Sequence, residues 1–332
     1  MYLEVTESNF EPTIKNITAL LKKEQIKFFI NKNLIAVVGP LPKKLNSIIS
    51  KNRNIKIKVG NGVPLLASRD FHPQNSVVET LHNTIGDGSF VIMGGPCSVE
   101  SEEHIFKMAK LLKDAGATVL RGGAFKPRTS PYSFQGLGKA GLIYLRRAAD
   151  TYGLDVITEV MDETTLPFVA KYTDILQVGA RNMQNFSLLK AIGKLDIPVA
   201  LKRGMSATID DLLNASEYIA SGGNRKIILV ERGIRTFDNK YTRNTFDISA
   251  VSVLKKLTHY PVILDPSHAI GVSDLVPELM LTSAATSADG EIVEVHNNPK
   301  EAFSDGQQAV LPEKFAQTVK KAIQIHNLYM KQ

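Results

Sequence analysis

The chain has 332 residues, of which 43% are hydrophobic and 22% are charged, and its formal net charge is +7. This composition is typical of a soluble globular protein, and the length accommodates one large domain with a smaller module. No apolar run approaches the roughly 20 residues that span a bilayer, and the single Cys excludes an internal disulfide framework. The N-terminus lacks the pattern of a secretory signal, so we expect a cytoplasmic protein.

The excess positive charge lies in the first 62 residues, which carry eleven Lys or Arg against four acids, a difference of +7. The remaining 29 basic and 29 acidic residues cancel. Because the basic residues do not cluster with Arg or aromatic side chains, they indicate a solvated surface rather than a nucleic-acid site. We therefore expect neither nucleic acid nor a membrane as a partner.

Residues 1–62 predict a small α+β domain. Strands are expected at 1–5, 26–30, 34–38 and 55–59, and helices at 11–23 and 45–50. The resulting order βαββαβ is the ferredoxin-like pattern. Gly and Pro residues at 60–64 interrupt both periodicities, so we place the domain boundary between residues 62 and 63.

From residue 90 onward, short apolar runs alternate with predicted helices. The eight runs lie at 90–97, 118–123, 155–159, 174–181, 198–204, 226–233, 261–268 and 291–296. The helices are expected at 102–114, 138–152, 165–171, 187–192, 208–221, 248–257, 275–287 and 312–329. This alternation predicts an α/β fold in which residues 63–332 form a (β/α)8 TIM barrel.

Each apolar run ends in a residue that can bind a phosphate, a carboxylate or a metal. These residues are Cys97, Arg121, Glu159, Arg181, Lys202, Arg232, His268 and Glu294. Because a (β/α)8 barrel builds its active site at the carboxyl ends of its strands, we expect the eight side chains to share one site. The long loops 122–138 and 233–247 are expected to close over a substrate.

The cations in this set indicate a site for two anions. Four strands end in Lys or Arg, the second loop adds Lys126 and Arg128, and Arg203 and Arg235 lie close by in the sequence. Arg offers bidentate geometry to a phosphate or carboxylate, whereas Lys offers a point charge. A single cation of this kind usually pairs with a surface acid or extends into solvent, but four strand ends are a stronger signal.

A second group of residues could bind a metal ion. Cys97, His268, Glu294 and Asp305 offer a thiolate, an imidazole and two carboxylates, which suit Mn, Fe, Co or Zn better than Mg or Ca. Their long spacing makes the signal weak by itself, because a lone Cys is more often a small buried hydrophobe. We expect His296 to be structural rather than a ligand.

Several motifs together resemble one enzyme family over about residues 64–330. They are GGPCSVES, LRGGAFKPRTSPYSFQG, VITEV, QVGARNMQN, KRGM, ERGIRTF, YTRNTFD, DPSH, and EVH followed by SDGQQ. The chain resembles the type I 3-deoxy-D-arabino-heptulosonate 7-phosphate (DAHP) synthases. It is most similar to their Iβ subgroup, some members of which carry an N-terminal ferredoxin-like regulatory domain.

The resemblance implies a transferase that condenses phosphoenolpyruvate with erythrose 4-phosphate in the first step of the shikimate pathway, which leads to chorismate and the aromatic amino acids. It implies a divalent metal held by Cys97, His268, Glu294 and Asp305, which replaces the hydrophobic interpretation of Cys97. The implied phosphoenolpyruvate ligands are Arg121, Lys126, Arg181, Lys202 and Arg232. The implied erythrose 4-phosphate ligands are Lys126, Pro127, Arg128 and Thr129. Catalysis would involve Lys126, Glu159, Cys97 and His268. The resemblance also implies a homotetramer whose activity is inhibited by an aromatic amino acid, such as tyrosine or phenylalanine.

Two alternatives remain. The first is 3-deoxy-D-manno-octulosonate 8-phosphate synthase, which uses arabinose 5-phosphate and has a KANRSS-like segment where this chain reads KPRTSPY. The second is a non-catalytic sensor of phosphorylated metabolites. Such a sensor would be expected to lose a metal ligand or Lys126, and both are retained.

Overall fold

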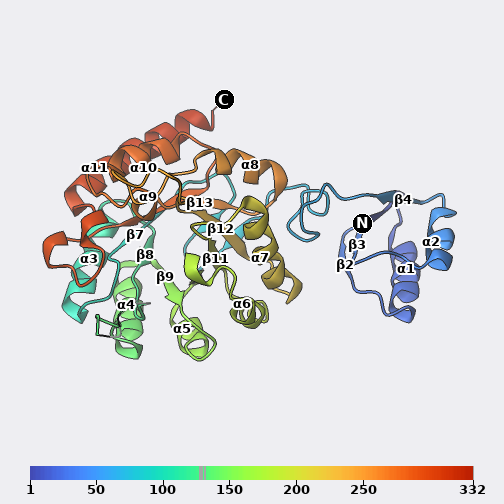
Figure 1. Ribbon diagram of the computed structural model, residues 1–332, viewed down its shortest axis with the longest axis horizontal. Coiled ribbons are helices and arrows are strands. Elements are labelled where there is room, and N and C mark those ends of the chain that lie inside the picture. Colours follow the sequence, from blue (N-terminus) through green and yellow to red (C-terminus); the bar gives the residue numbers. More distant parts are fainter. Residues whose placement is uncertain (127–129, 131, 332) are drawn as a thin grey trace. The chain divides into compact units, whose positions relative to one another are not determined.

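The structure is a computed structural model that describes residues 1–126, 130 and 132–331 (Figure 1). The chain forms two compact units. The first comprises residues 1–74 together with 256–259, and the second comprises the rest. None of the described helices is both long and apolar enough to cross a bilayer.

The first unit extends beyond Gly62, where the sequence places the boundary, to Gln74. The added segment packs against the strands of this unit. Asn31 Nδ2 donates to Phe71 O at 2.7 Å, and the rings of Phe71 and Tyr2 stack with centroids 6.2 Å apart.

The elements of the first unit follow the predicted order βαββαβ. They are β1 (Tyr2–Val5), α1 (Glu11–Lys23), β2 (Phe28–Asn31), β3 (Leu34–Val37), α2 (Lys43–Ser50) and β4 (Ile55–Lys58). The strands form an antiparallel sheet in the order β2-β3-β1-β4. Both helices cover one face of this sheet, where Leu3, Ile17, Leu21 and Ile35 belong to a common core (Figure 1).

Eight parallel strands close into a barrel in the second unit, and helices surround it (Figure 1). The strands are β7 (Val91–Gly95), β8 (Val119–Arg121), β9 (Asp155–Val160), β10 (Ile175–Val178), β11 (Val199–Lys202), β12 (Ile227–Glu231), β13 (Val262–Leu264) and β14 (Gly290–Glu294). The main helices are α3 (Glu102–Asp114), α4 (Lys139–Tyr152), α5 (Leu166–Tyr172), α6 (Phe186–Ile192), α7 (Ile209–Ser221), α8 (Ser249–Leu257), α10 (Val276–Ala284) and α11 (Pro312–Tyr329). The predicted (β/α)8 barrel is confirmed.

Branched and other apolar side chains fill the barrel interior. This cluster includes Val91, Met93, Val119, Ile157, Ile175, Ala200, Ile228, Ile263 and Ile292. The strands are buried on both faces, which explains why the sequence shows continuous apolar runs rather than alternation. Polar side chains can therefore gather only at the ends of the barrel.

A short hairpin that the sequence does not predict packs against the interior cluster at one end of the barrel. Its strands are β5 (Val78–Glu79) and β6 (Thr84–Ile85), and Val78 and Ile85 belong to the interior cluster. Asp155, the first residue of β9, accepts hydrogen bonds from Thr80 Oγ1, from His82 N and from Asn83 Nδ2. Because Asp155 begins its strand, the hairpin lies at the amino ends of the strands and leaves the carboxyl ends open.

Candidate active site

A cavity of about 340 Å³ lies at the carboxyl ends of the barrel strands. Its described lining residues are Arg121, Lys126, Ser130, Ser133, Glu159, Gln177, Gly179, Ala180, Arg181, Lys202, Met205, Arg232, Arg243, His268 and Asp305. Six of these are Lys or Arg and two are Glu or Asp, so the cavity favours anionic ligands. Eight of the residues predicted from the sequence lie around this one cavity.

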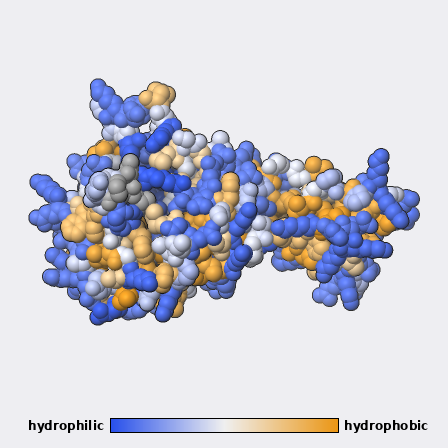
Figure 2. Space-filling view, turned by 60° about the horizontal axis from the view of Figure 1, so that its bottom comes forward, coloured by the Kyte–Doolittle hydropathy of each residue, from blue (hydrophilic) through white to orange (hydrophobic). Residues whose placement is uncertain are grey.

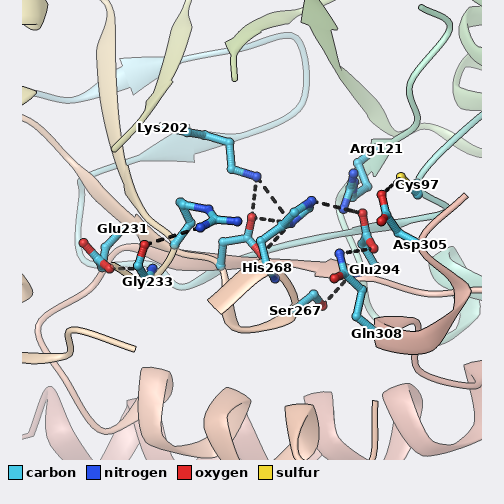
Figure 3. Close-up of polar contacts among 12 residues, drawn as sticks. Cys97, Arg121, Lys202, Glu231, Gly233, Ser267, His268, Glu294, Asp305 and Gln308 are labelled. Atoms are coloured by element: carbon cyan, nitrogen blue, oxygen red, sulfur yellow. Dashed lines mark hydrogen bonds and ion pairs between the residues drawn. The ribbon is translucent and has the colours of Figure 1, made fainter. Parts of the chain in front are cut away.

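Three of the four expected metal donors lie next to one another. The ligand atoms of Cys97, Glu294 and Asp305 are all within 4.8 Å of each other (Figure 3). Cys97 follows β7 and Glu294 ends β14, and these two strands are neighbours in the barrel. Cys97 Sγ donates to Asp305 Oδ2 at 3.0 Å. A thiol and two carboxylates at this separation could bind one ion.

His268, the fourth expected donor, lies on the short helix α9 (Pro266–Ile270), with Nε2 3.3 Å from Glu294 Oε1. Its Nδ1 lies 2.8 Å from Asp265 Oδ2. Both ring nitrogens therefore face carboxylates, and because Asp265 holds Nδ1 as a hydrogen-bond donor, Nε2 is the nitrogen placed to bind a metal beside Glu294. Asp265 also accepts from His268 N at 3.0 Å, so it fixes both the helix end and the imidazole.

Asp265 has a second cationic partner, because Lys202 Nζ donates to its Oδ2 in a buried ion pair. Burial alone would raise the pKa of Asp265, but the charges of His268 and Lys202 hold that pKa well below its usual value. Burial lowers the pKa of Lys202, and the Asp265 carboxylate opposes this shift. The pair joins the ends of β11 and β13.

Glu294 is held by two donors besides its contact with His268. Arg121 NH1 donates to Oε1 at 2.9 Å, and Gln308 Nε2 donates to Oε2 at 2.6 Å (Figure 3). Burial would raise the pKa of Glu294, but His268 and Arg121 lower it, so Glu294 remains a carboxylate. Gln308 Oε1 accepts from Arg243 NH1 at 2.9 Å, which connects Glu294 to the loop after β12.

Lys126 lies beside the thiol. Its Nζ donates to Cys97 O and to Cys97 Sγ, both at 2.9 Å. Burial, with a further contribution from Glu294, raises the pKa of the Cys97 thiol to about 12. The thiol therefore keeps its proton unless a cation stabilises the thiolate.

Three arginines around the cavity, Arg181, Arg232 and Arg243, have no acidic partner among the residues that the structure describes. Arg232 is only 3% exposed, and its one side-chain hydrogen bond within the described part of the chain is from NH1 to Gly233 O at 3.4 Å. Arg181 lies just after β10 in the 3₁₀ turn η1 (Ala180–Asn182). Burial lowers the pKa of Arg232. A ligand with negative charge would compensate the buried guanidinium of Arg232, whereas Arg181 is exposed to solvent.

Glu159 lies on β9 and lines both the main cavity and an adjoining pocket shared with Cys97 and Lys126. Its carboxylate lies against the backbone of Gly179 after β10. A Cβ at Gly179 would collide with Glu159 Oε1, so a larger residue there would force the carboxylate to move.

The suggestion that Arg203 takes part in anion binding is wrong. Its NH1 donates to Glu231 Oε2 at 2.9 Å and to Asp247 Oδ2 at 2.8 Å, and it does not line the cavity. Adjacent residues at a strand end project to opposite sides, so Lys202 faces the cavity and Arg203 faces away. Arg235 is also not among the lining residues.

Asp265, Arg243 and Gln308, which contact the charged groups of this site, are absent from the sequence-based set. Each lies in a motif, DPSH, YTRNTFD or SDGQQ, but the sequence of these motifs does not show which side chains they contact. Pro127, Arg128 and Thr129, the expected erythrose 4-phosphate ligands, lie outside the described residues.

The sequence is similar to two kinds of known enzyme. A model of the DAHP synthetase I family matches residues 67–329. A phospho-2-dehydro-3-deoxyheptonate aldolase from Thermotoga maritima is 54% identical over 256 residues, which are 77% of this chain and 75% of that protein. A 2-dehydro-3-deoxyphosphooctonate aldolase from Vesicomyosocius okutanii is 30% identical over 251 residues, 70% of this chain and 88% of that protein.

Solved structures agree with the sequence matches. The crystal structure of a Thermotoga maritima DAHP synthase has a TM-score of 0.79 at 44% identity, and the match covers 98% of this chain and 96% of that one. A truncated form of the DAHP synthase from the same organism has a TM-score of 0.74 at 48% identity. That match covers 79% of this chain and 96% of the truncated one.

The buried charge pairs of the site lead to a prediction for stability. Replacing Asp265 with Asn leaves Lys202 buried without a counter-ion, so we expect the free energy of unfolding in urea at pH 7 to fall by about 3–5 kcal/mol. Because the pKa of Asp265 is lowered by folding, its contribution is present above the usual carboxyl pKa and is lost as the pH falls through the lowered value.

The matched control is Asp196→Asn. Asp196 pairs with Lys226 at 2.8 Å, but its side chain is 89% exposed, so we expect a loss below about 1 kcal/mol. Both variants are measured without added metal. Equal losses of unfolding free energy in the two variants would contradict the importance of the buried pair.

Proposed function

The chain belongs to the DAHP synthetase I family, and from this premise we propose that it condenses phosphoenolpyruvate with erythrose 4-phosphate to give DAHP and phosphate. The relative with 54% identity carries the name of this activity. The reaction would be the first step of the shikimate pathway and would take place in the cytoplasm.

One observation of this structure supports the proposed reaction most directly. Four potential metal donors from separate parts of the barrel adjoin a cavity in which Arg181 and Arg232 have no acidic partner among the described residues. A substrate pair with two phosphates and one carboxylate suits such a cavity. A metal next to it suits a reaction at a carbonyl group.

Cys97, His268, Glu294 and Asp305 would hold a divalent ion of the Mn, Fe, Co or Zn type. The donor set fits, since thiol, imidazole and carboxylate groups converge there and Asp265 directs His268 Nε2 toward them. When bound, the ion would supply Lewis-acid polarisation of the aldehyde oxygen. Cys97 would have to lose its proton, and the Lys126 ammonium lies where it favours the thiolate.

The reaction joins C3 of phosphoenolpyruvate to the aldehyde carbon of erythrose 4-phosphate. Water then adds to C2, and phosphate leaves by cleavage of the C–O bond. We assign phosphoenolpyruvate to Arg121, Lys126, Arg181, Lys202 and Arg232. Lys126 would donate a proton to the oxygen of the former aldehyde, and Glu159 would orient the water and accept its proton.

The alternative 3-deoxy-D-manno-octulosonate 8-phosphate synthase is the less similar of the two enzymes. The relative that carries the corresponding name is 30% identical to this chain, whereas the heptonate enzyme is 54% identical. A non-catalytic sensor would not need four metal donors and the Lys126 ammonium beside them.

An assay of phosphoenolpyruvate consumption distinguishes these functions. With added Mn²⁺, we expect turnover with erythrose 4-phosphate, and we expect kcat/KM for arabinose 5-phosphate to be lower by about tenfold or more. Chelation should abolish the turnover, and added divalent ions should restore it. A preference for arabinose 5-phosphate would support the alternative enzyme, and no turnover with either sugar would support the sensor.

We infer a regulatory role for the first unit, within a homotetramer. The edge strands β2 and β4 expose Ile30 and Ile57, which are 50% and 38% accessible, and Val59 follows at 90%. Figure 2 shows hydrophobic residues among hydrophilic ones on this unit. Exposed edges of this kind can pair with a second copy and form an effector site. The proposed effector is an aromatic amino acid such as tyrosine or phenylalanine.

Deletion of residues 1–62 tests this role. The deletion keeps residues 63–74, which are hydrogen-bonded to the segment 256–259. His259 Nε2 donates to Leu66 O at 2.8 Å, and Arg69 N donates to Leu257 O at 3.2 Å. Because the described residues that line the cavity all belong to the second unit, catalysis should persist while inhibition by the amino acid is lost. An intact enzyme that ignores tyrosine, phenylalanine, tryptophan, chorismate and prephenate would contradict regulation and leave only a role in assembly.

A further inference from the structure

Asp305 differs from the other three expected metal donors in its position. Cys97 and Glu294 lie at or next to the ends of strands, and His268 lies on a helix that Asp265 caps. Asp305 lies in the loop between β14 and α11, with φ at +50°, a left-handed backbone that residues with a Cβ rarely adopt. A loop residue in this conformation needs a specific restraint to stay near the other donors.

The segment after β7 provides this restraint through three contacts with residues 303–305. Cys97 Sγ contacts Asp305 Oδ2 at 3.0 Å, the Ser98 and Ser304 hydroxyl groups are hydrogen-bonded at 2.8 Å, and Glu100 Oε1 accepts from Phe303 N at 2.8 Å. The first contact joins two metal donors, so it would change when an ion binds. The other two contacts can persist in the metal-bound enzyme.

Glu100 is itself oriented by His296. His296 Nδ1 accepts from Asn298 N at 3.0 Å, so the neutral ring carries its proton on Nε2, which lies 3.3 Å from Glu100 Oε2. Each carboxylate oxygen of Glu100 therefore has its own donor. One is the side chain of His296, and the other is the backbone of Phe303.

Glu100, His104 and His296 also have the donor types of a metal site, and their ligand atoms lie within 4.8 Å of one another. The hydrogen bonds of His296 argue against that role. Metal-bound histidines donate their second ring N–H, whereas His296 Nδ1 accepts from a backbone amide. His104 Nε2 donates to Asn297 Oδ1 at 2.8 Å, which connects the cluster to the loop again. The cluster supports the loop that carries Asp305.

We propose that Glu100 is a positioning residue for the metal site: by holding the amide of Phe303 it keeps the Asp305 carboxylate beside Cys97 and Glu294. This inference rests on the proposed metal role of those residues. Partners that orient metal ligands typically change metal affinity by about 10- to 100-fold when they are removed. We assign an effect of this size to Glu100, which does not itself touch the ion or the substrates.

Cobalt titration of the metal-free full-length protein tests the assignment, because a Co²⁺–thiolate bond to Cys97 gives a charge-transfer band that needs no turnover. Glu100→Ala should raise the Kd for Co²⁺ by about 10- to 100-fold. Glu100→Gln, which retains an acceptor for Phe303 N, should remain closer to the wild type. The control Glu102→Ala removes an acid that pairs with Arg147 at the surface and should leave the Kd unchanged.

The steady-state rate gives a second readout. Activity of Glu100→Ala should recover as the metal concentration is raised, which a general loss of structure would not allow. If Glu100→Ala does not fold, Glu100→Asp decides, because it keeps the charge but withdraws the acceptor from Phe303 N and should also weaken Co²⁺ binding. Wild-type affinity for Co²⁺ in Glu100→Ala, or in Glu100→Asp if the Ala variant does not fold, would overturn the role of Glu100. A wild-type protein without the thiolate band would instead overturn the proposed metal site.

Discussion

Buried charges at the mouth of the barrel must each meet an opposite charge or a ligand, and this requirement organises the whole site. Arg121 is neutralised by Glu294, and Lys202 is neutralised by Asp265. These two ion pairs bring strand ends from opposite parts of the sequence together. They also leave Arg232, 3% exposed, without a carboxylate among the described residues. The positive charge that remains in the cavity is therefore available to substrate anions.

The same carboxylates link the cations of the cavity to the expected metal donors. Asp265 accepts from Lys202 on the side of the cavity and from His268 on the side of the metal donors. Glu294 contacts Arg121 and, through Gln308, is connected to Arg243. These contacts connect the cations that line the cavity to the four expected metal donors. In this account the metal and the two phosphorylated substrates occupy one connected network of charges.

The barrel and the strand-end residues could be predicted because the strands are buried on both faces, so apolar runs such as 227–231 end abruptly in charged residues. The tertiary contacts between side chains from different elements could not be predicted. The contact between Gln308 and Glu294 depends on a loop conformation, and KRGM does not show which of Lys202 and Arg203 faces the cavity. The two-residue strands β5 and β6 are too short for an alternating pattern to appear. Local periodicity thus predicts elements and their ends, but not tertiary pairs.

Anomalous diffraction from crystals grown with Mn²⁺ and phosphoenolpyruvate would test the central claim most directly. The account predicts one strong manganese peak among Cys97, His268, Glu294 and Asp305, with the phosphate of the ligand between Arg181 and Arg232. A peak at Glu100, His104 and His296, or no manganese beside Cys97, would contradict it.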